Sequence, residues 1–238
     1  VMQKILQAAL ILLWVSCAQL PGPIVLAGGG SFDDAFFRRT LQLSETAHPA
    51  VIIFPQASQR EEAGSESSQI WTRAGAASTF VADFRSTQGW DSTLEHLSQA
   101  NVIWFTGGSQ LRLVAAMESA EFLQHIKARW REGAVIGGTS AGASVMGDIM
   151  PSGKELYPGF GICKNTIVDQ HFTERSRQPR LRYAVRVHHG YRGLGISEGT
   201  AVFLHGRYAR TYGSGMVHVY ESAEALKVLP PNSVESLY

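Results

Sequence analysis

The stretch Ala134-Val-Ile-Gly-Gly-Thr-Ser-Ala-Gly-Ala-Ser-Val-Met146 decides the fold. A short apolar run, 134–136, is followed by a serine framed by glycines, Gly138-Thr-Ser140-Ala-Gly142, and then by small residues suited to a helix. This order of strand, turn and helix is typical of the G-x-S-x-G nucleophile elbow, whose tight turn admits only glycine on either side of the serine. The serine oxygen would stand clear of the backbone at a helix N-terminus. The stretch therefore predicts Ser140 as a nucleophile, although the motif alone fits several hydrolase folds.

The segments before the elbow alternate between apolar strands and helical stretches. We expect strands at 24–27, 51–54, 79–82, 102–105 and 134–136, and helices around 35–43, 67–75, 92–99 and 111–131. Short continuous apolar strands separated by helices indicate a parallel sheet that is covered on both faces. The pattern predicts an α/β fold with a three-layer, doubly wound and mostly parallel sheet.

The polar and glycine-rich loops of this half of the chain follow predicted strands. They are 28–30, 56–58 and 107–110, together with the elbow. In open α/β sheets ligands bind outside the carboxyl ends of the strands, so these loops should surround one site. Beyond residue 160 the pattern predicts strands at 162–168, 201–204, 216–220 and 226–229, with Gly213-Ser-Gly215 as the turn of a C-terminal β-hairpin. The sequence shows no repeat or linker, and residues 19–238 are expected to form a single catalytic domain.

The first 18 residues have the character of a secretory signal. Lys4 supplies the positive start, 5–15 is an apolar run, and Ser16-Cys17-Ala18 offers small residues for cleavage. The apolar run is too short to span a bilayer as a stable helix. We expect a protein that is secreted or periplasmic. Lipid attachment at Cys17 is one alternative, and a buried first strand or helix is another.

Composition and charge limit the partners. The chain has 238 residues, of which 45% are hydrophobic and 17% charged, as in an ordinary globular domain. Without residues 1–18 the formal charge is zero, so neither nucleic acid nor a membrane surface is expected as the main partner. Cys163 would be the one remaining cysteine, and no Cys/His spacing suggests a metal. Gly28-Gly-Gly30 lacks the third glycine of a dinucleotide motif, because Asp33 stands there. We expect no metal and no organic cofactor; the oligomeric state stays open, a homodimer included.

A serine nucleophile also needs a general base and donors for the oxyanion. The backbone N–H of Ala141 is a natural first donor, and the Gly107-Gly108 turn could supply a second because glycine allows close approach to a substrate. Among eight histidines, His171 stands out because it ends an apolar run beside other polar residues. His188 and His189 are rivals that spacing alone does not exclude.

Arginines are concentrated just after His171. Five of them lie between 175 and 186, with only Glu174 to oppose them nearby. Such a segment is either a solvated helix face or a site for substrate carboxylates, which arginine binds in a bidentate manner.

Four longer stretches together carry a family resemblance: Gly138-Thr-Ser-Ala-Gly-Ala143, Phe105-Thr-Gly-Gly-Ser-Gln110, Asp169-Gln-His-Phe-Thr-Glu-Arg-Ser-Arg-Gln-Pro-Arg-Leu181 and Gly195-Ile-Ser-Glu-Gly-Thr-Ala201. They resemble the cyanophycinases, serine peptidases of family S51 that are related to dipeptidase E. The resemblance covers nearly the whole chain after residue 18. It implies the flavodoxin-like fold of the class I glutamine amidotransferases.

The resemblance also implies roles for single residues. Ser140 would be the nucleophile, His171 the base and Glu198 the acid, with Ser197 where the family usually has aspartate. The positions that would shape the substrate pocket are Gln110, Asp169, Gln170, Arg175, Arg177 and Arg180. Ser109 replaces an aspartate that is frequent before that glutamine, which bears on substrate preference. The residues alone favour Asp169 as the acid, although a side chain two positions before His171 on one strand points alongside it.

These observations predict an exported serine peptidase that hydrolyses β-linked aspartyl peptides. Cyanophycin, a polyaspartate with arginine on its side chains, is the first-choice substrate, and β-Asp-Arg dipeptides are the expected product. A peptidase of the same fold with another substrate, such as an α-aspartyl dipeptidase, is the nearest alternative. The chain order Ser, His, Glu and the lack of an HGGG-type loop disfavour an esterase. A non-catalytic binding module is the alternative from a different class.

Overall fold

The computed structural model describes residues 20–82, 84, 86–119 and 122–236. The expected signal at 1–18 and its Cys17 lie outside the described residues. Within the described part of the chain, no helix is long and apolar enough to cross a membrane.

The larger of two sheets has eight strands, in the order β14-β11-β10-β1-β5-β4-β2-β3. Five of its strands run parallel: β1 (Ile24–Ala27), β2 (Ala50–Phe54), β3 (Ser78–Val81), β4 (Val102–Phe105) and β5 (Val135–Thr139). The other three add on antiparallel beside β1: β10 (Thr200–His205), β11 (Tyr208–Gly213) and β14 (Val234–Ser236). The elbow strand β5 therefore lies between β1 and β4, in the middle of the parallel region.

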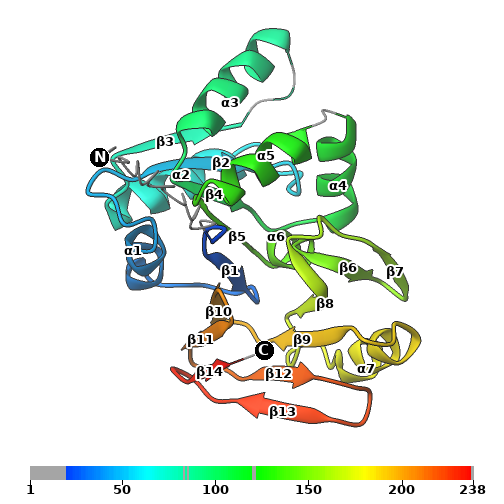
Figure 1. Cartoon of the computed structure of the whole chain (residues 1–238). Helices are drawn as coiled ribbons and strands as arrows, with labels where there is room; N and C mark the ends of the chain where they lie inside the picture. The colour runs from blue at the N-terminus through cyan, green and yellow to red at the C-terminus, as the bar shows by residue number, and fades with distance from the viewer. Residues whose placement is uncertain (1–19, 83, 85, 120–121, 237–238) are drawn as a thin grey trace, which may run out of the picture.

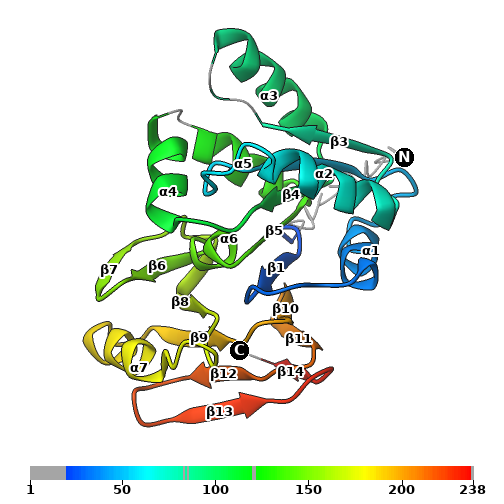
Figure 2. The ribbon, with the colours of Figure 1, turned by 180° about the vertical axis from the view of Figure 1, so that it is seen from behind.

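Helices cover both faces of this sheet. Helices α1 (Asp34–Gln42) and α2 (Ala63–Ala74) share one core with Val25, Ile53 and Trp104. Helices α3 (Thr87–Gln99), α4 (Gln110–Ser119) and α5 (Phe122–Arg131) share the other with Leu26 and Phe105. Neighbouring residues of a strand point to opposite faces, so fully apolar strands can supply both cores. Helix α5 lies in front of the sheet in Figure 1, and α2 lies in front in Figure 2. The predicted three-layer, doubly wound fold is confirmed.

A second, six-stranded sheet runs from β13 at the bottom of Figure 1 to β7 at the right, in the order β13-β12-β9-β8-β6-β7. Its strands are β6 (Gly147–Ser152), β7 (Glu155–Pro158), β8 (Cys163–Gln170), β9 (Arg192–Ile196), β12 (Val217–Tyr220) and β13 (Leu226–Leu229). Helix α7 (Gln178–Val187) packs on it through a small apolar cluster that includes Ile167, Phe172 and Leu181. The sequence predicted three of these strands but not the separate sheet that they build.

The C-terminal hairpin exists, but its predicted turn was wrong. Strands β12 and β13 pair antiparallel through the loop 221–225. Gly213-Ser-Gly215 instead connects β11 of the first sheet to β12 of the second. Gly213 has φ +103°, and a Cβ there would lie 1.9 Å from the Gly199 carbonyl oxygen. The glycines therefore allow the chain to pass close to the 197–199 loop as it changes sheets.

Candidate active site

Ser140 lies at the sharp turn between β5 and the short helix α6 (Ala141–Ser144). Its backbone has φ 52° and ψ −109°, a conformation that non-glycine residues rarely adopt and that is typical of functional sites. A Cβ on Gly138 would lie 2.6 Å from the Gly142 carbonyl carbon, and one on Gly142 would lie 2.3 Å from the Phe105 oxygen. Both glycines of the motif are therefore required by close backbone packing. They hold the half-exposed serine in a fixed position.

His171 faces Ser140 from the end of β8. Its Nε2 lies 2.7 Å from Ser140 Oγ, and its own backbone N–H donates to the Gly28 carbonyl at 2.7 Å. The residue has φ +47° and is 9% exposed. A Cβ on Gly29 would lie 2.3 Å from the imidazole Cε1. The His171 ring therefore packs directly against the glycine run that follows β1. This close packing explains why the run contains glycine at position 29.

Glu198 lies on the loop between β9 and β10 and completes the arrangement. Its Oε1 is 2.5 Å from His171 Nδ1. When Nδ1–H donates to this carboxylate, Nε2 is left as the acceptor for the serine hydroxyl, which is the tautomer that a general base needs. The His171 side chain is 11% exposed and that of Glu198 is 39% exposed. Three side chains from three separate loops therefore form one hydrogen-bonded line that opens to solvent at its acid.

Two contacts tie the base-bearing loop to the acid-bearing loop. The Glu198 backbone N–H donates to Glu174 Oε2 at 3.1 Å, and the hydroxyls of Thr173 and Ser197 lie 2.8 Å apart. Both partners from the first loop follow His171 within three residues. Sequence reasoning did not single out Thr173 or assign Glu174 a role at the site. Their only signal was their position beside the candidate base.

Two backbone N–H groups lie where an oxyanion could be held. Ala141 is the first residue of α6, where N–H groups have no partner within the helix. Gly108 follows β4 with φ +143°, and a Cβ there would lie 2.1 Å from the Ala57 oxygen. Gly107, its neighbour, comes so close to Ser140 that an added Cβ would be 3.5 Å from the serine Cβ. The predicted oxyanion turn therefore does lie against the elbow.

A cavity of about 530 Å³ begins at this turn. Gly107, Gly108 and Thr139 form its wall next to Ser140. It extends over the α1 and α2 face of the sheet, and Arg60 and Glu66 line it from the segment that follows β2. The sequence placed 56–58 at the site but not the residues after it. Their signal was their position at the carboxyl end of a parallel strand.

The residues predicted to bind substrate lie in three different environments. Asp169 is fully buried and bonded to two guanidiniums: Arg180 Nε at 2.9 Å, Arg180 Nη2, and Arg177 Nη1 at 3.3 Å. Arg177 Nη1 also donates to Gln170 Oε1 at 2.5 Å. Gln110 is buried and donates to the Pro151 carbonyl at 2.8 Å. The structure thus joins four of the six residues in one network, defined by Asp169, Gln170, Arg177 and Arg180.

Arg175 is the exposed member of the predicted set, and its backbone N–H donates to the His171 carbonyl at 3.1 Å. In the buried network, burial raises the pKa of Asp169, and the two guanidiniums oppose this shift. Burial also lowers the pKa of Arg177. These directions follow from removing charged groups from water, which disfavours their ionised forms.

The competing candidates for the base and the acid lie elsewhere. His188 is the C-cap of α7 and packs on Tyr191, with ring centroids 5.6 Å apart, and His189 is exposed. Asp169 is bonded to Arg177 and Arg180, whereas Glu198 is the carboxylate bonded to His171. The geometry therefore places Glu198, not Asp169, in contact with the imidazole.

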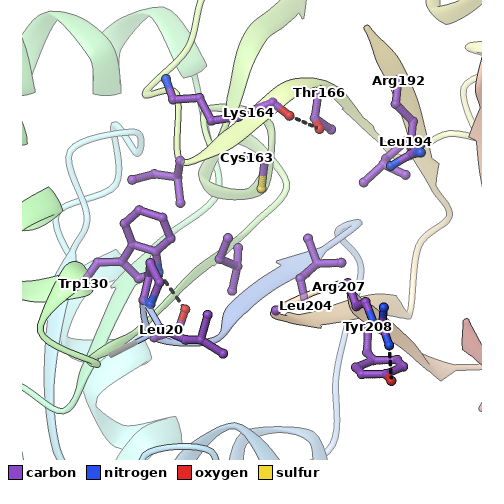
Figure 3. Close-up of a pocket in the computed structure, with 15 residues that line it drawn as sticks. Leu20, Trp130, Cys163, Lys164, Thr166, Arg192, Leu194, Leu204, Arg207 and Tyr208 are labelled. Carbon is purple, nitrogen blue, oxygen red and sulfur yellow. Dashed lines mark hydrogen bonds between the residues drawn. The ribbon is translucent and has the colours of Figure 1, made fainter. Parts of the chain in front are cut away.

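A second cavity lies at the opposite end of the strands and is drawn in Figure 3. It measures about 380 Å³, and its walls include Ile24, Trp130 and Leu204, with Lys164 from the second sheet. Ile24 begins β1, whereas Ala27 ends it and accepts the Ser140 backbone N–H at 2.9 Å. Cys163 also lines the cavity, and burial raises the pKa of its thiol to about 12. This cavity is separate from the site built around the elbow, and its thiol is not activated.

Comparisons with known proteins identify the family. The model of peptidase family S51 matches residues 24–212. The chain belongs to peptidase family S51. It is 34% identical over 217 residues to the cyanophycinase of Geminocystis herdmanii, covering 83% of this chain and 80% of that protein. It is 31% identical over 229 residues to the cyanophycinase of Trichormus variabilis, covering 87% and 76%.

Solved structures show the same fold. A peptidase from an acI-B1 Actinobacterium superposes with a TM-score of 0.77 at 20% identity, covering 92% of this chain and 98% of that one. A putative peptidase E from Listeria monocytogenes gives a TM-score of 0.60 at 16% identity, covering 82% and 100%. With the S51 membership, the chain is a serine-type peptidase. Among the described residues, no group of three or more His, Cys, Asp or Glu side chains could hold a metal ion.

Proposed function

We propose that this S51 peptidase degrades cyanophycin to β-Asp-Arg dipeptides, with Ser140, His171 and Glu198 as its catalytic residues. The observation that carries the proposal is the hydrogen-bonded line from Ser140 Oγ through both imidazole nitrogens to Glu198. Two relatives that are 34% and 31% identical are cyanophycinases, which supports cyanophycin as the substrate. Release of intact β-Asp-Arg leaves the side-chain amide in place. The bond that is cut is therefore the backbone amide at an aspartate whose β-carboxyl carries arginine, and not the β-aspartyl bond that the sequence analysis expected.

In the proposed reaction, Ser140 Oγ attacks the carbonyl carbon while His171 Nε2 takes the hydroxyl proton. Glu198 stabilises the imidazolium that forms and keeps its ring in place through Nδ1. The N–H groups of Ala141 and Gly108 hold the negative charge that develops on the carbonyl oxygen. His171 then gives its proton to the leaving amine, and the carbon–nitrogen bond breaks.

Hydrolysis of the acyl-enzyme repeats these steps with water as the nucleophile and Ser140 as the leaving group. His171 takes a proton from a water molecule, the hydroxide attacks the ester carbon, and Ser140 leaves with the proton returned by the imidazole. Of the predicted substrate-binding residues, Arg175 is exposed and can meet a substrate carboxylate directly. Arg177 and Arg180 are already bonded to Asp169, Gln170 accepts from Arg177, and Gln110 donates to the Pro151 carbonyl, so in this proposal these four residues support the site without holding the substrate carboxylate.

The test is product analysis after incubation of the purified protein with cyanophycin. The proposal predicts a β-Asp-Arg dipeptide by mass, and its loss in Ser140→Ala by a factor on the order of 10³ to 10⁶. Circular dichroism would check that the variant is folded. Free arginine with a polyaspartate remnant would mean that the side-chain amide is cut instead. Turnover of α-Asp-X dipeptides but not of cyanophycin would assign the enzyme to the dipeptidases.

We also propose export, on the basis of the signal-like residues 1–18. Expression of the full chain in a bacterial host, followed by intact mass of the protein from the periplasm, tests this. A mass that begins after residue 18 supports plain secretion. A diacylglycerol-sized increase on a chain that begins at Cys17 would mean a lipoprotein, and an uncleaved cytoplasmic chain would contradict export.

A further inference from the structure

The 530 Å³ cavity beside Ser140 has features that the proposed mechanism leaves unused. Its volume lies in the range of small-ligand sites, and it starts at Gly107 and Gly108, where the scissile carbonyl would be held. A group attached near that carbonyl would therefore extend into it. The cavity is a natural place for a branch of the substrate.

The inner walls of the cavity are apolar and aromatic. They include Phe32 from the loop before α1, Phe37 from α1, Ile70 from α2 and Trp104 from β4. Such walls suit the aliphatic stem of a long side chain, and aromatic faces also attract a guanidinium. The walls alone would equally suit an uncharged apolar branch.

The charges in the cavity decide between these ligands. Among the described residues that line it, Arg60 and Glu66 are the two charged ones, and Arg60 Nη2 bonds Glu66 Oε1 at 2.5 Å. Their side chains are 65% and 49% exposed. An ion pair this exposed contributes little stability, so a ligand can separate it at small cost. A ligand with one cation and one carboxylate would give each partner a new counter-ion.

We propose that this cavity binds an arginine branch of the substrate. The Glu66 carboxylate receives the guanidinium, Arg60 binds the free α-carboxylate of the same arginine, and the aromatic walls pack along the stem. The inference deepens the proposed function and rests on it, since it treats the cavity as part of the Ser140 site. It assigns recognition of the arginine branch to Arg60 and Glu66, which follow β2, and not to the Asp169 network.

Equilibrium binding to the Ser140→Ala protein tests the guanidinium contact without turnover. The ligands are β-Asp-Arg and β-Asp-citrulline, in which an uncharged urea replaces the guanidinium. We expect roughly fivefold or greater preference for the arginine ligand. Glu66→Gln in the same background should remove most of that preference. Glu224→Gln is the matched control, because Glu224, in the loop between β12 and β13, forms an exposed pair with Arg186 of α7 at 3.6 Å.

The carboxylate contact is tested with β-Asp-argininamide, which lacks the free α-carboxylate. We expect Arg60→Gln to lose the preference for the acid over the amide while keeping the preference for arginine over citrulline. Equal affinity for arginine and citrulline ligands, or an unchanged ratio in Glu66→Gln, would overturn the inference. If cyanophycin is not degraded but these preferences hold, the proposed function fails and the binding site stands. If cyanophycin is degraded without them, the opposite conclusion follows.

Discussion

The segment 169–180 supplies two polar clusters of opposite character. His171 belongs to the line with Ser140 and Glu198, which ends in a carboxylate that is 39% exposed. Asp169, two residues earlier, is fully buried and bonded to two arginines. Both clusters are hydrogen-bonded, but only the first leaves a side chain open to a ligand. A carboxylate near a candidate base in sequence is thus a weak guide to its role, because adjacent loops supply the contact instead.

The largest expected difference between the two carboxylates is in catalysis. Glu198→Gln should lower kcat by about 10² to 10⁴, because an amide neither stabilises the imidazolium nor fixes the same tautomer. Asp169→Asn should retain far more activity when it is assayed under conditions in which it is folded. Rates on cyanophycin for both variants, with circular dichroism as the folding control, measure this. A loss of several orders of magnitude confined to Asp169→Asn would reverse the assignment of the acid.

Stability should show the opposite order. Asp169→Asn leaves the half-buried guanidiniums of Arg177 and Arg180 without their buried counter-ion, and breaking such a pair costs about 3 to 5 kcal/mol. Glu198→Gln should change the free energy of unfolding by about 1 kcal/mol or less, because its carboxylate is partly exposed. Urea unfolding of both variants gives the comparison. Equal losses would mean that Asp169 is not the structural member of the pair.

The contact between Gly29 and the His171 ring can be tested with two glycines of nearly equal φ. Gly29 has φ +107°, and an added Cβ would lie 2.3 Å from the imidazole, whereas Gly75 has φ +105° and nothing within 4 Å of such a Cβ. Gly29→Ala should lower kcat by roughly 10², since displacing the base by about 1 Å can cost that much. Gly75→Ala should cost about 1 kcal/mol of stability and leave kcat unchanged. Equal kcat in both variants would show that the contact with the ring is unimportant.

The smallest expected effect is on the pH dependence of stability, through His218, which packs on the residue after His171. Phe172 packs on His218 with ring centroids 5.0 Å apart, and burial lowers the pKa of His218 from its ordinary 6.5. As pH falls below 6.5, the unfolded chain takes up this proton before the folded one does, so the fold loses stability until its own lower pKa is reached. Urea midpoints at pH 7.5 and 5.5 should therefore fall more in wild type than in His218→Gln. An equal fall in both would show that His218 does not contribute.

Much of the first sheet could be predicted because its strands are continuous apolar runs that serve two cores. The second sheet could not. Strands such as Gly147–Ser152 and Arg192–Ile196 contain glycine or proline and are not continuous apolar runs, so their pairing depends on tertiary contacts rather than on local pattern. The turn at 213–215 was wrongly predicted for the same reason. Glycine is required at Gly213 by close packing against Gly199, which local pattern does not reveal.

The site was predictable to the extent that its signals are local. The elbow and the glycine turn after β4 follow from short motifs and strand ends. Glu198, by contrast, is 27 residues from His171 and reaches it only because the β9 to β10 loop lies against Gly29 and Gly30. Residue spacing carries no information on that contact, and the family resemblance supplied it. Arg60 lies in the loop after β2 and Glu66 in the first turn of α2, and their place beside the site became visible only in the fold.

Covalent labelling by a fluorophosphonate tests the central claim most directly, because it asks whether Ser140 is an activated nucleophile without assuming a substrate. Intact mass should show one adduct on the wild-type protein, and peptide mapping should place it on Ser140. Ser140→Ala should show none, and Glu198→Gln should react more slowly. Labelling that persists in Ser140→Ala, or that maps to another residue, would contradict the account.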